Sequence, residues 1–271
     1  QSTPSGGALP YTSFVWSGPN GYNANVEDPA DFQANMSANG SYTVTVTDQL
    51  GCTATASVTV VVNPTPTITV QNNGPMCAGA TAIVSSSPSG GTPGYSFQWT
   101  GPDFFGAFVE DPSPFTATAA SGGIYQVKVT DSKGCTSTAT TTLVVNAKPN
   151  VMATNNGPLC VGANLDLKSN PTDGSGNYSA FNWTGPNGFG SFLENPTPFP
   201  VTLANAGTYH VTVTDNQGCT GTSSTILSVS NNDAPSITAN SNSPLCGGNL
   251  LSLNSTPSAG TPPYNAFAWA G

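Results

Sequence analysis

Few side chains of this 271-residue chain could carry out acid–base or metal chemistry. His210 is the one histidine, and it stands where equivalent segments of the sequence have Thr43 and Gln126. A catalytic triad or a His-ligated metal site needs an imidazole with further groups around it, and the sequence offers no second histidine to complete one. We therefore predict that His210 is an exposed residue, that the chain is not an enzyme, and that it holds no metal or other cofactor.

Carboxylates recur in three dipeptides, Glu-Asp at 27–28, Glu-Asp at 110–111 and Glu-Asn at 194–195, each followed by proline. Neighbouring residues of a strand point to opposite faces, whereas a glycosidase needs two carboxyl groups that oppose each other. The dipeptides therefore indicate turns, with a weak calcium or sugar contact as the alternative. Three further acidic residues precede a glycine by three positions, where a carboxylate can bond the backbone of a turn: Asp48, Asp131 and Asp215.

Aromatic rings are a further group that could bind a ligand, because exposed rings can stack on sugars. Tyr22, Phe105 and Phe189 each follow a tryptophan by six residues. Their regular recurrence favours packing in a core, since buried aromatic rings contribute large contact areas. A glycan contact is the alternative.

The six cysteines fall into two classes, a Cys-x-Gly class and a Gly-Cys class. No Cys-x-x-Cys spacing, which would indicate zinc, occurs. Their regular spacing favours disulfides of an extracellular protein. The first class contains Cys77, Cys160 and Cys246, and the second contains Cys52, Cys135 and Cys219.

These groups recur because the sequence is a tandem repeat. Successive tryptophans are 83, 84 and 86 residues apart, and each of the first three is followed by a tyrosine after 26 residues and a cysteine after 36. We predict four copies, at 1–63, 64–146, 147–230 and 231–271, with the first and last incomplete and all within a longer chain. The expected core residues are Trp16, Trp99, Trp183, Trp269, Tyr42, Tyr125 and Tyr209.

Strands are predicted in every copy. The segments YTVTVTD, YQVKVTD and YHVTVTD alternate apolar and polar residues, the period of a half-buried strand, and an Asp-x-x-Gly turn leads from each into a return strand. The 24 prolines and 30 glycines interrupt every stretch long enough for a helix. About 84 residues with some seven short strands, a tryptophan on the third and a tyrosine opening the sixth, fit an immunoglobulin-like sandwich. The expected fold class is all-β, with tandem sandwiches arranged as a rod.

This topology favours one disulfide pairing over another. The loop after strand A and the loop between strands F and G lie at opposite ends of a sandwich, roughly 25–30 Å apart, whereas a disulfide needs Cα atoms within about 7 Å. Strand G of one copy leads through a short linker to the F–G end of the next. We therefore predict a Cys77–Cys219 bridge between copies, with the other cysteines paired outside residues 1–271. The alternative is pairing within copies, Cys77–Cys135 and Cys160–Cys219.

Composition excludes two classes of partner. Charged residues make up 6% of the chain, and the net charge is −9, with four lysines and no arginine. Nucleic-acid binding requires a basic footprint, so no nucleic-acid partner is expected. No apolar run approaches the roughly 18 residues of a membrane span, so this segment is expected not to insert into a membrane.

The repeated order of Cys-x-Gly, Gly-Gly-Thr-Pro-x-Tyr, a tryptophan followed by glycine, and Gly-x-Tyr-x-Val-x-Val-Thr-Asp-x-x-Gly-Cys resembles the PKD-like and SprB-type repeats of large surface adhesins of Bacteroidota-like bacteria. The resemblance covers nearly the whole chain. It implies a non-catalytic structural or adhesive segment of a secreted bacterial surface protein or extracellular fibre. Its partners would be itself, as neighbouring repeats or fibre copies, or polysaccharide and other cell surfaces. The rival function is a carbohydrate-binding accessory array of a secreted polysaccharide-degrading enzyme, with Tyr22, Phe105 and Phe189 as exposed platforms.

Overall fold

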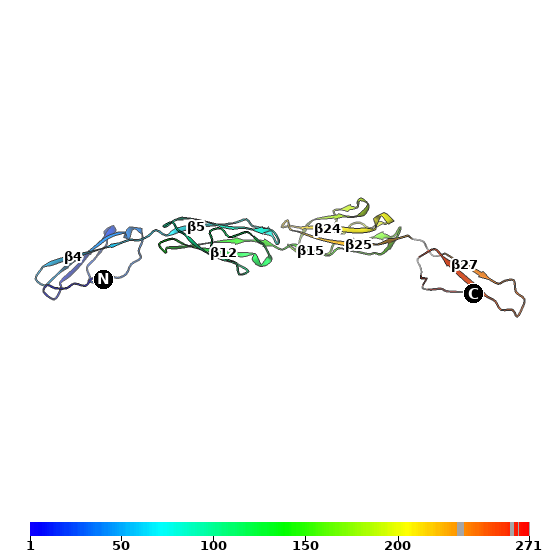
Figure 1. The fold of residues 1–271 in the computed structure, drawn as a ribbon, viewed down its shortest axis with the longest axis horizontal. Coiled ribbons are helices and arrows are strands. Elements are labelled where there is room, and N and C mark those ends of the chain that lie inside the picture. Colours follow the sequence, from blue (N-terminus) through cyan, green and yellow to red (C-terminus); the bar gives the residue numbers. More distant parts are fainter. Residues whose placement is uncertain (232–235, 261–262, 265, 271) are drawn as a thin grey trace. The chain divides into compact units, whose positions relative to one another are not determined.

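The computed structural model describes residues 1–231, 236–260, 263–264 and 266–270 (Figure 1). The chain divides into two compact units, Gln1–Val145 and Asn146–Gly271. The described residues form strands and single turns of 3₁₀ helix, with no α-helix among them. The fold is all-β and consists of tandem immunoglobulin-like sandwiches, which confirms the predicted fold class.

The first unit contains two four-stranded antiparallel sheets. In the first copy the order is β2 (Asn23–Ala24), β1 (Ser13–Ser17), β3 (Gly40–Thr47), β4 (Thr53–Val60). In the second copy it is β10 (Gly106–Ala107), β9 (Ser96–Thr100), β12 (Gly123–Thr130), β13 (Thr136–Leu143). The second copy also contains β5 (Pro66–Asn72) paired with β8 (Val84–Gly90), β7 (Thr81–Ala82) paired with β11 (Phe115–Thr116), and the short strands β6 (Met76–Cys77) and β14 (Val145–Asn146). The 3₁₀ turns are η1 (Pro19–Gly21), η2 (Met36–Ala38) and η3 (Ala119–Ser121).

The second unit repeats this arrangement in the third copy. Its four-stranded sheet has the order β22 (Gly190–Ser191), β21 (Tyr178–Thr184), β24 (Gly207–Asp215), β25 (Thr220–Leu227). The paired short strands are β15 (Pro149–Val151) with β20 (Pro171–Asp173), β16 (Thr154–Asn155) with β19 (Leu167–Lys168), β17 (Leu159–Cys160) with β26 (Val229–Ser230), and β18 (Asn164–Leu165) with β23 (Phe199–Pro200). The 3₁₀ turns are η4 (Pro186–Gly188) and η5 (Leu203–Asn205), and the fourth copy contributes β27 (Ser236–Ser241) paired with β28 (Leu253–Ser258).

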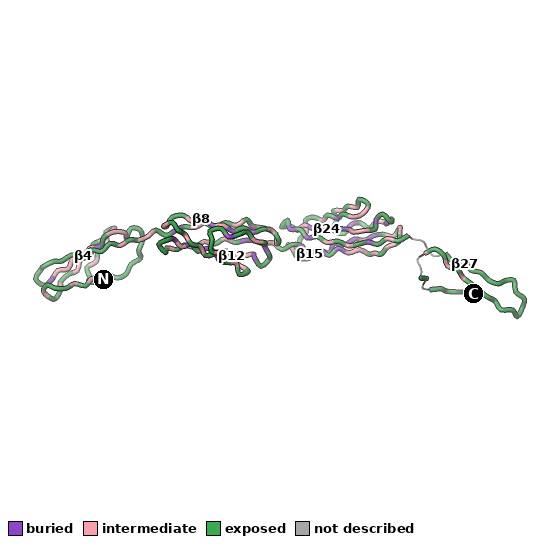
Figure 2. Tube along the Cα trace, viewed as in Figure 1, coloured by how far each residue is buried: buried purple, intermediate pink, exposed green. Residues whose placement is uncertain are grey.

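Strand β12 shows why these segments form half-buried strands. Tyr125, Val127 and Val129 are fully buried, whereas Gln126 and Lys128 between them are exposed. Alternation at period two puts one set of side chains on the core face and the other in solvent. Figure 2 shows that the buried residues lie mainly in 64–230, while the first and fourth copies are drawn mostly as exposed and intermediate.

Tryptophans and tyrosines are central to the cores of the first three copies. Trp99 is 1% exposed, and its indole N–H donates to the carbonyls of Val109 and Glu110. The Tyr125 hydroxyl donates to the Ser121 carbonyl at 2.9 Å, four residues upstream, which is the bond of a tyrosine corner. The same hydroxyl bond is formed by Tyr42 at 3.2 Å and by Tyr209 at 3.0 Å.

Trp269 of the fourth copy differs from these three tryptophans. It is 55% exposed, whereas Trp183 is fully buried. In the third copy β24 and β25 supply much of the core around Trp183, and residues up to 271 include no counterpart of these strands.

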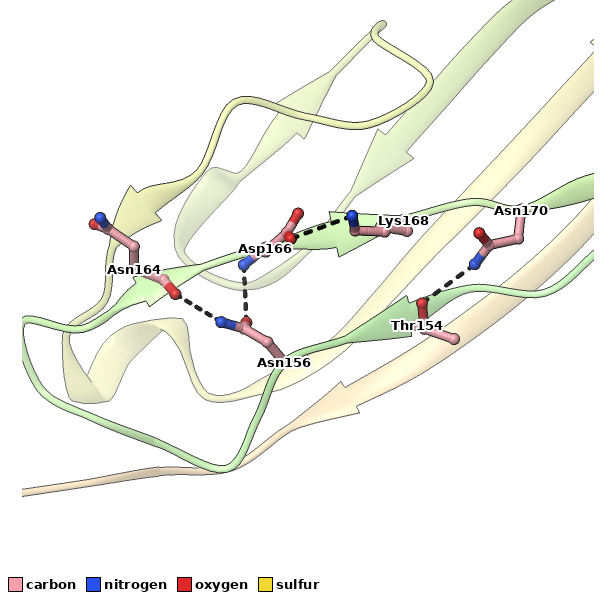
Figure 3. A network of polar contacts seen from close by, with 6 residues as sticks. All are labelled: Thr154, Asn156, Asn164, Asp166, Lys168 and Asn170. Carbon is pink, nitrogen blue, oxygen red and sulfur yellow. Dashed lines mark hydrogen bonds and ion pairs between the residues drawn. The ribbon is translucent and has the colours of Figure 1, made fainter.

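In three copies one asparagine side chain makes two hydrogen bonds to the backbone of a neighbouring segment, in place of backbone–backbone bonds of a sheet. The Asn156 amide donates to the Asn164 carbonyl at 3.0 Å and accepts from the Asp166 N–H at 2.8 Å (Figure 3). Asn73 and Asn242 form the same two bonds in the second and fourth copies. In the third copy one side chain thus holds two segments together beside β16 and β18, which are only two residues long.

Candidate functional site

The two cysteines of the second copy lie at opposite ends of it. The Cys135 thiol lies 3.9 Å from the carbonyl of Asn63, in the segment that leads into this copy. At the other end, Met76 precedes Cys77 and donates its backbone N–H to the carbonyl of Val144, just after β13. The eight residues of β13 separate these places by about 26 Å. A disulfide within the copy is therefore geometrically excluded.

The third copy has the same arrangement. Cys160 lies with its sulfur 3.8 Å from the Ser230 hydroxyl, beyond the end of β25. Cys219 is fully buried just before β25 begins. Two residues on, a Cβ added to Gly221 would lie 2.0 Å from the Pro149 carbonyl oxygen, so the segment that begins this copy runs against that strand. Glycine is required there by this close approach.

The bonding state of the cysteines follows this geometry. Cys77 and Cys219 are each disulfide-bonded, whereas Cys52, Cys135, Cys160 and Cys246 are free thiols. The alternative pairs within copies, Cys77–Cys135 and Cys160–Cys219, are therefore not formed. The reason is the length of the strand between the two cysteines of a copy.

The aspartates before each Gly-Cys organise the turn that presents the second-class cysteine. The Asp131 carboxylate accepts the backbone N–H groups of Lys133 and Cys135 through one oxygen and of Thr92 through the other, all at 2.9 Å. The Thr92 bond, followed by those within the turn, holds the pKa of Asp131 below its ordinary value, although burial of the carboxyl opposes this. The backbone N–H groups of Ala8 and Cys52 lower the pKa of Asp48 in the same way.

The Glu-Asp dipeptides are structural turns, as predicted. The carbonyl of Glu110 accepts the indole N–H of Trp99, and the Asp111 carboxylate accepts the backbone N–H of Ser86 at 3.0 Å. The Ser86 hydroxyl donates to the Glu110 carbonyl at 2.8 Å. The carbonyl and carboxylate oxygens thus tie the turn to the tryptophan and to strand β8, and no pair of opposed carboxyl groups results.

The three rings considered as glycan contacts face the core. Tyr22, Phe105 and Phe189 are half-buried and pack edge-on against the corner tyrosines of their copies, at centroid distances of 5.2, 4.9 and 5.2 Å. This packing against the cores favours the core interpretation of the three rings over the glycan platform. Exposed rings of the same segments include Phe32, Phe104, Phe108 and Phe192.

The remaining polar groups are dispersed. His210 is exposed on β24, as predicted, opposite Ser224 and Thr184 in the sheet. Within the described residues the one ion pair joins Lys168 to Asp166 at 3.5 Å (Figure 3), and no group of three metal-ligating side chains occurs there. None of the helical segments in the described part of the chain is long and apolar enough to span a membrane.

Comparison with known proteins identifies similarity in fold alone. No family model and no curated protein matches the chain. Three N-terminal domains of the highly immunogenic outer capsid protein of bacteriophage RB49 are similar at 14% identity, covering 80% of this chain and 88% of that one, with a TM-score of 0.39. An I-band fragment of titin is similar at 13% identity, covering 83% and 90%, with a TM-score of 0.42. The insect immune protein hemolin is similar at 13% identity, covering 80% and 67%, with a TM-score of 0.38.

Proposed function

We propose that the chain is a non-catalytic structural and adhesive repeat segment of a large secreted bacterial surface protein or extracellular fibre. Its four immunoglobulin-like copies are 1–63, 64–146, 147–230 and 231–271, and it associates with further copies of itself or with polysaccharide. The observation that carries the proposal is the placement of the cysteines. The two classes lie at opposite ends of a copy, and one member of each class, Cys77 and Cys219, is disulfide-bonded.

Chain connectivity supports a bond between these two cysteines. Cys77 lies beside the strand that ends at Val144, and Cys219 lies near the segment that begins at Pro149. Five residues of chain, from Val144 to Pro149, span at most about 17 Å, which is short enough to allow such a bond. A Cys77–Cys219 bond adds a second covalent link between consecutive copies, which removes hinge freedom and stiffens the array.

The surface suits such an array. Charged residues make up 6% of the chain, so the polar side chains on its surface are mainly uncharged. Few surface charge pairs exist for salt to screen, and the array would keep its properties across a wide range of ionic strength. The rival carbohydrate-binding array loses its support, because the rings on which it depended pack in the cores.

The disulfide is tested by proteolysis without reduction, followed by mass spectrometry. We expect a linked peptide that contains Cys77 and Cys219, and a linked Cys77–Cys135 peptide would overturn the bridge. The mechanical role is tested by negative-stain imaging of the angle between consecutive copies in Cys77→Ser and Cys219→Ser. Both variants should show a wider spread of angles than the wild type, whereas the control Cys160→Ser, which removes a free thiol, should not. Equal spreads in all four proteins would contradict the stiffening role.

A further inference from the structure

The second and third copies each expose a phenylalanine at the same place beside the main sheet. Phe108 follows the edge strand β10 and is 79% exposed, and Phe192 follows the edge strand β22 and is 81% exposed. Single exposed apolar side chains are ordinary in proteins. A ring that recurs at one exposed position in two copies adds nothing to either core, which points to a ligand.

Strand pairing places both rings on the outer face of the sheet, which is the face away from the core. Ala107 of β10 pairs with Trp99, whose side chain is buried in the core. Side chains of successive strand residues point to opposite faces, so the next residue, Phe108, lies on the outer face. In the third copy Ser191 pairs with Trp183, and the phenylalanine that follows is placed in the same way.

The backbone that carries each ring is fixed from the core side. The Trp99 indole N–H donates to the carbonyl of Val109 at 3.1 Å, one residue after the first ring. The Trp183 indole N–H donates to the carbonyl of Glu194 at 3.2 Å, two residues after the second ring. A ring on a fixed backbone loses little conformational freedom when it binds a ligand, so less of the binding energy is lost to ordering.

Polar side chains occupy the neighbouring positions of the outer face. All of them are exposed, and within the described part of the chain none of these side chains is hydrogen-bonded. In the second copy they are Gln98, Thr100, Gln126 and Thr140, and in the third copy they are Asn182, Thr184, His210 and Ser224. Their amide, hydroxyl and imidazole groups are therefore available to a ligand.

A ring beside free amide and hydroxyl groups suits an uncharged sugar unit. The C–H face of a sugar ring can pack on the apolar face of an aromatic side chain. Sugar hydroxyls both donate and accept hydrogen bonds, as the amides and hydroxyls of the outer face do. A few polar groups of this kind next to an apolar contact fix the orientation of a bound ligand.

Charge and apolar area disfavour the other classes of partner. Glu110 and Glu194 each follow a ring by two residues and are exposed, and the net charge is −9, which disfavours anionic glycans and anionic lipids. Lys128 lies on the outer face of the second copy, but Thr212 stands at its place in the third copy. A protein partner would need a more continuous apolar core, whereas free polar groups flank each ring.

We propose that the outer faces of the β10-β9-β12-β13 and β22-β21-β24-β25 sheets each bind a sugar unit of a neutral polysaccharide. Phe108 and Phe192 are the stacking rings, and Gln98 and Asn182 on the adjacent strand supply hydrogen bonds. A long glycan offers repeated units to both surfaces, which strengthens binding through multivalency. The inference deepens the proposed function by naming its polysaccharide surface, and it rests on that function for this class of partner.

The test is native electrophoresis of the oxidised 271-residue protein through gels that contain one polysaccharide. The neutral probes are galactomannan, xyloglucan, hydroxyethyl cellulose and dextran, and the anionic probe is polygalacturonate. We expect at least one neutral probe to retard the wild type, and polygalacturonate not to. The double variant Phe108→Ala with Phe192→Ala should weaken binding by about tenfold or more, and each single variant by less.

Two further variants separate ring stacking from general apolar adhesion. Ile124 and Ile226 are exposed apolar residues of the same outer faces, so Ile124→Ala with Ile226→Ala is the matched control and should bind like the wild type. The double variant Gln98→Ala with Asn182→Ala keeps both rings and should still weaken binding.

Four results would overturn the surface assignment. They are a wild type that no neutral probe retards, equal retardation by polygalacturonate, a double-phenylalanine variant that binds like the wild type, and an isoleucine control that loses as much binding as that variant. Sedimentation velocity without glycan adds a fifth: self-association that is lost in the double-phenylalanine variant would assign the rings to contacts between copies.

Peptide mapping without reduction and angle measurement on the same double-phenylalanine variant test the proposed function separately. Its exposed substitutions should leave the disulfide and the spread of angles unchanged. A bridged, stiff chain that binds no neutral probe overturns only the polysaccharide surface. An unbridged, flexible chain that is retarded through Phe108 and Phe192 overturns only the structural role in the proposed function.

Discussion

The first and second copies follow one sequence template but differ in what lies over their main sheets. Strands β3 and β4 pair over eight residues in the same register as β12 and β13, and both copies form the tyrosine corner. Yet Trp16 keeps 8% of its surface exposed where Trp99 keeps 1%. The β-hairpin pairing and the tyrosine corner are thus specified by residues close in sequence. The complete burial of Trp99 also requires residues of β5 and β8, which pack on the same core.

The largest expected effect comes from removing the tryptophan of the closed core. Trp99→Ala should lower the stability of the second copy by about 3–5 kcal/mol, because it deletes a fully buried ring and leaves a cavity. Trp16→Ala should cost the first copy clearly less, since Trp16 is 8% exposed and lines a groove of about 420 Å³. Amide hydrogen exchange of β12 and of β3 reports each copy separately, which is needed because a multidomain chain does not unfold in two states. Equal losses in the two copies would show that the first core is closed in solution.

The first and second copies are alike in the Asp-x-x-Gly-Cys turn that begins at Asp48 and at Asp131. The carboxylates of Asp48 and Asp131 both have pKa values lowered by backbone N–H groups. A carboxyl whose pKa is lower in the folded state stabilises the protein above its ordinary pKa, near 3.8, and the stabilisation is lost as pH falls through the lowered value. We therefore expect acid to loosen this turn in both copies to a similar extent.

Asp131→Asn isolates this contribution in the second copy. The amide keeps one oxygen for the turn, but its NH₂ group cannot accept the Thr92 N–H that the second carboxylate oxygen accepts. The variant should be less stable than the wild type at neutral pH, and its stability should fall less steeply from about pH 5 to about pH 2. Thermal unfolding across this range checks the slope, with the other carboxylates unchanged between the two proteins. Parallel slopes would show that Asp131 does not stabilise the fold through its charge.

Residue patterns in the sequence predicted the strands, but they did not predict the side chains that connect one strand to another. Alternation in YQVKVTD is sufficient to place β12, because its period assigns each side chain to a face. Recurrence of the Phe105 position favoured packing in a core, but only the structure shows that Phe105 is half-buried while Phe108, three residues on, is exposed.

The two backbone hydrogen bonds made by the side chains of Asn73 and Asn156 were not predicted, for a similar reason. Asn73 and Asn156 substitute side-chain bonds for a backbone ladder, so the segment shows no strand period. The repeated Asn-Asn-Gly-Pro was the available signal.

The smallest expected effect has opposite signs in the second and third copies. The Ser86 hydroxyl donates to the Glu110 carbonyl at 2.8 Å, whereas the hydroxyl of the equivalent Ser169 is buried without a partner among the described residues. Ser86→Ala should therefore destabilise the second copy by about 1 kcal/mol, the usual net value of such a bond. Ser169→Ala should leave the third copy unchanged or stabilise it by up to about 1 kcal/mol, because it removes an unsatisfied buried polar group. Hydrogen exchange of β12 and β24 measures both, and a destabilised Ser169→Ala would reveal a bond to Ser169 that forms in solution, for example to a buried water.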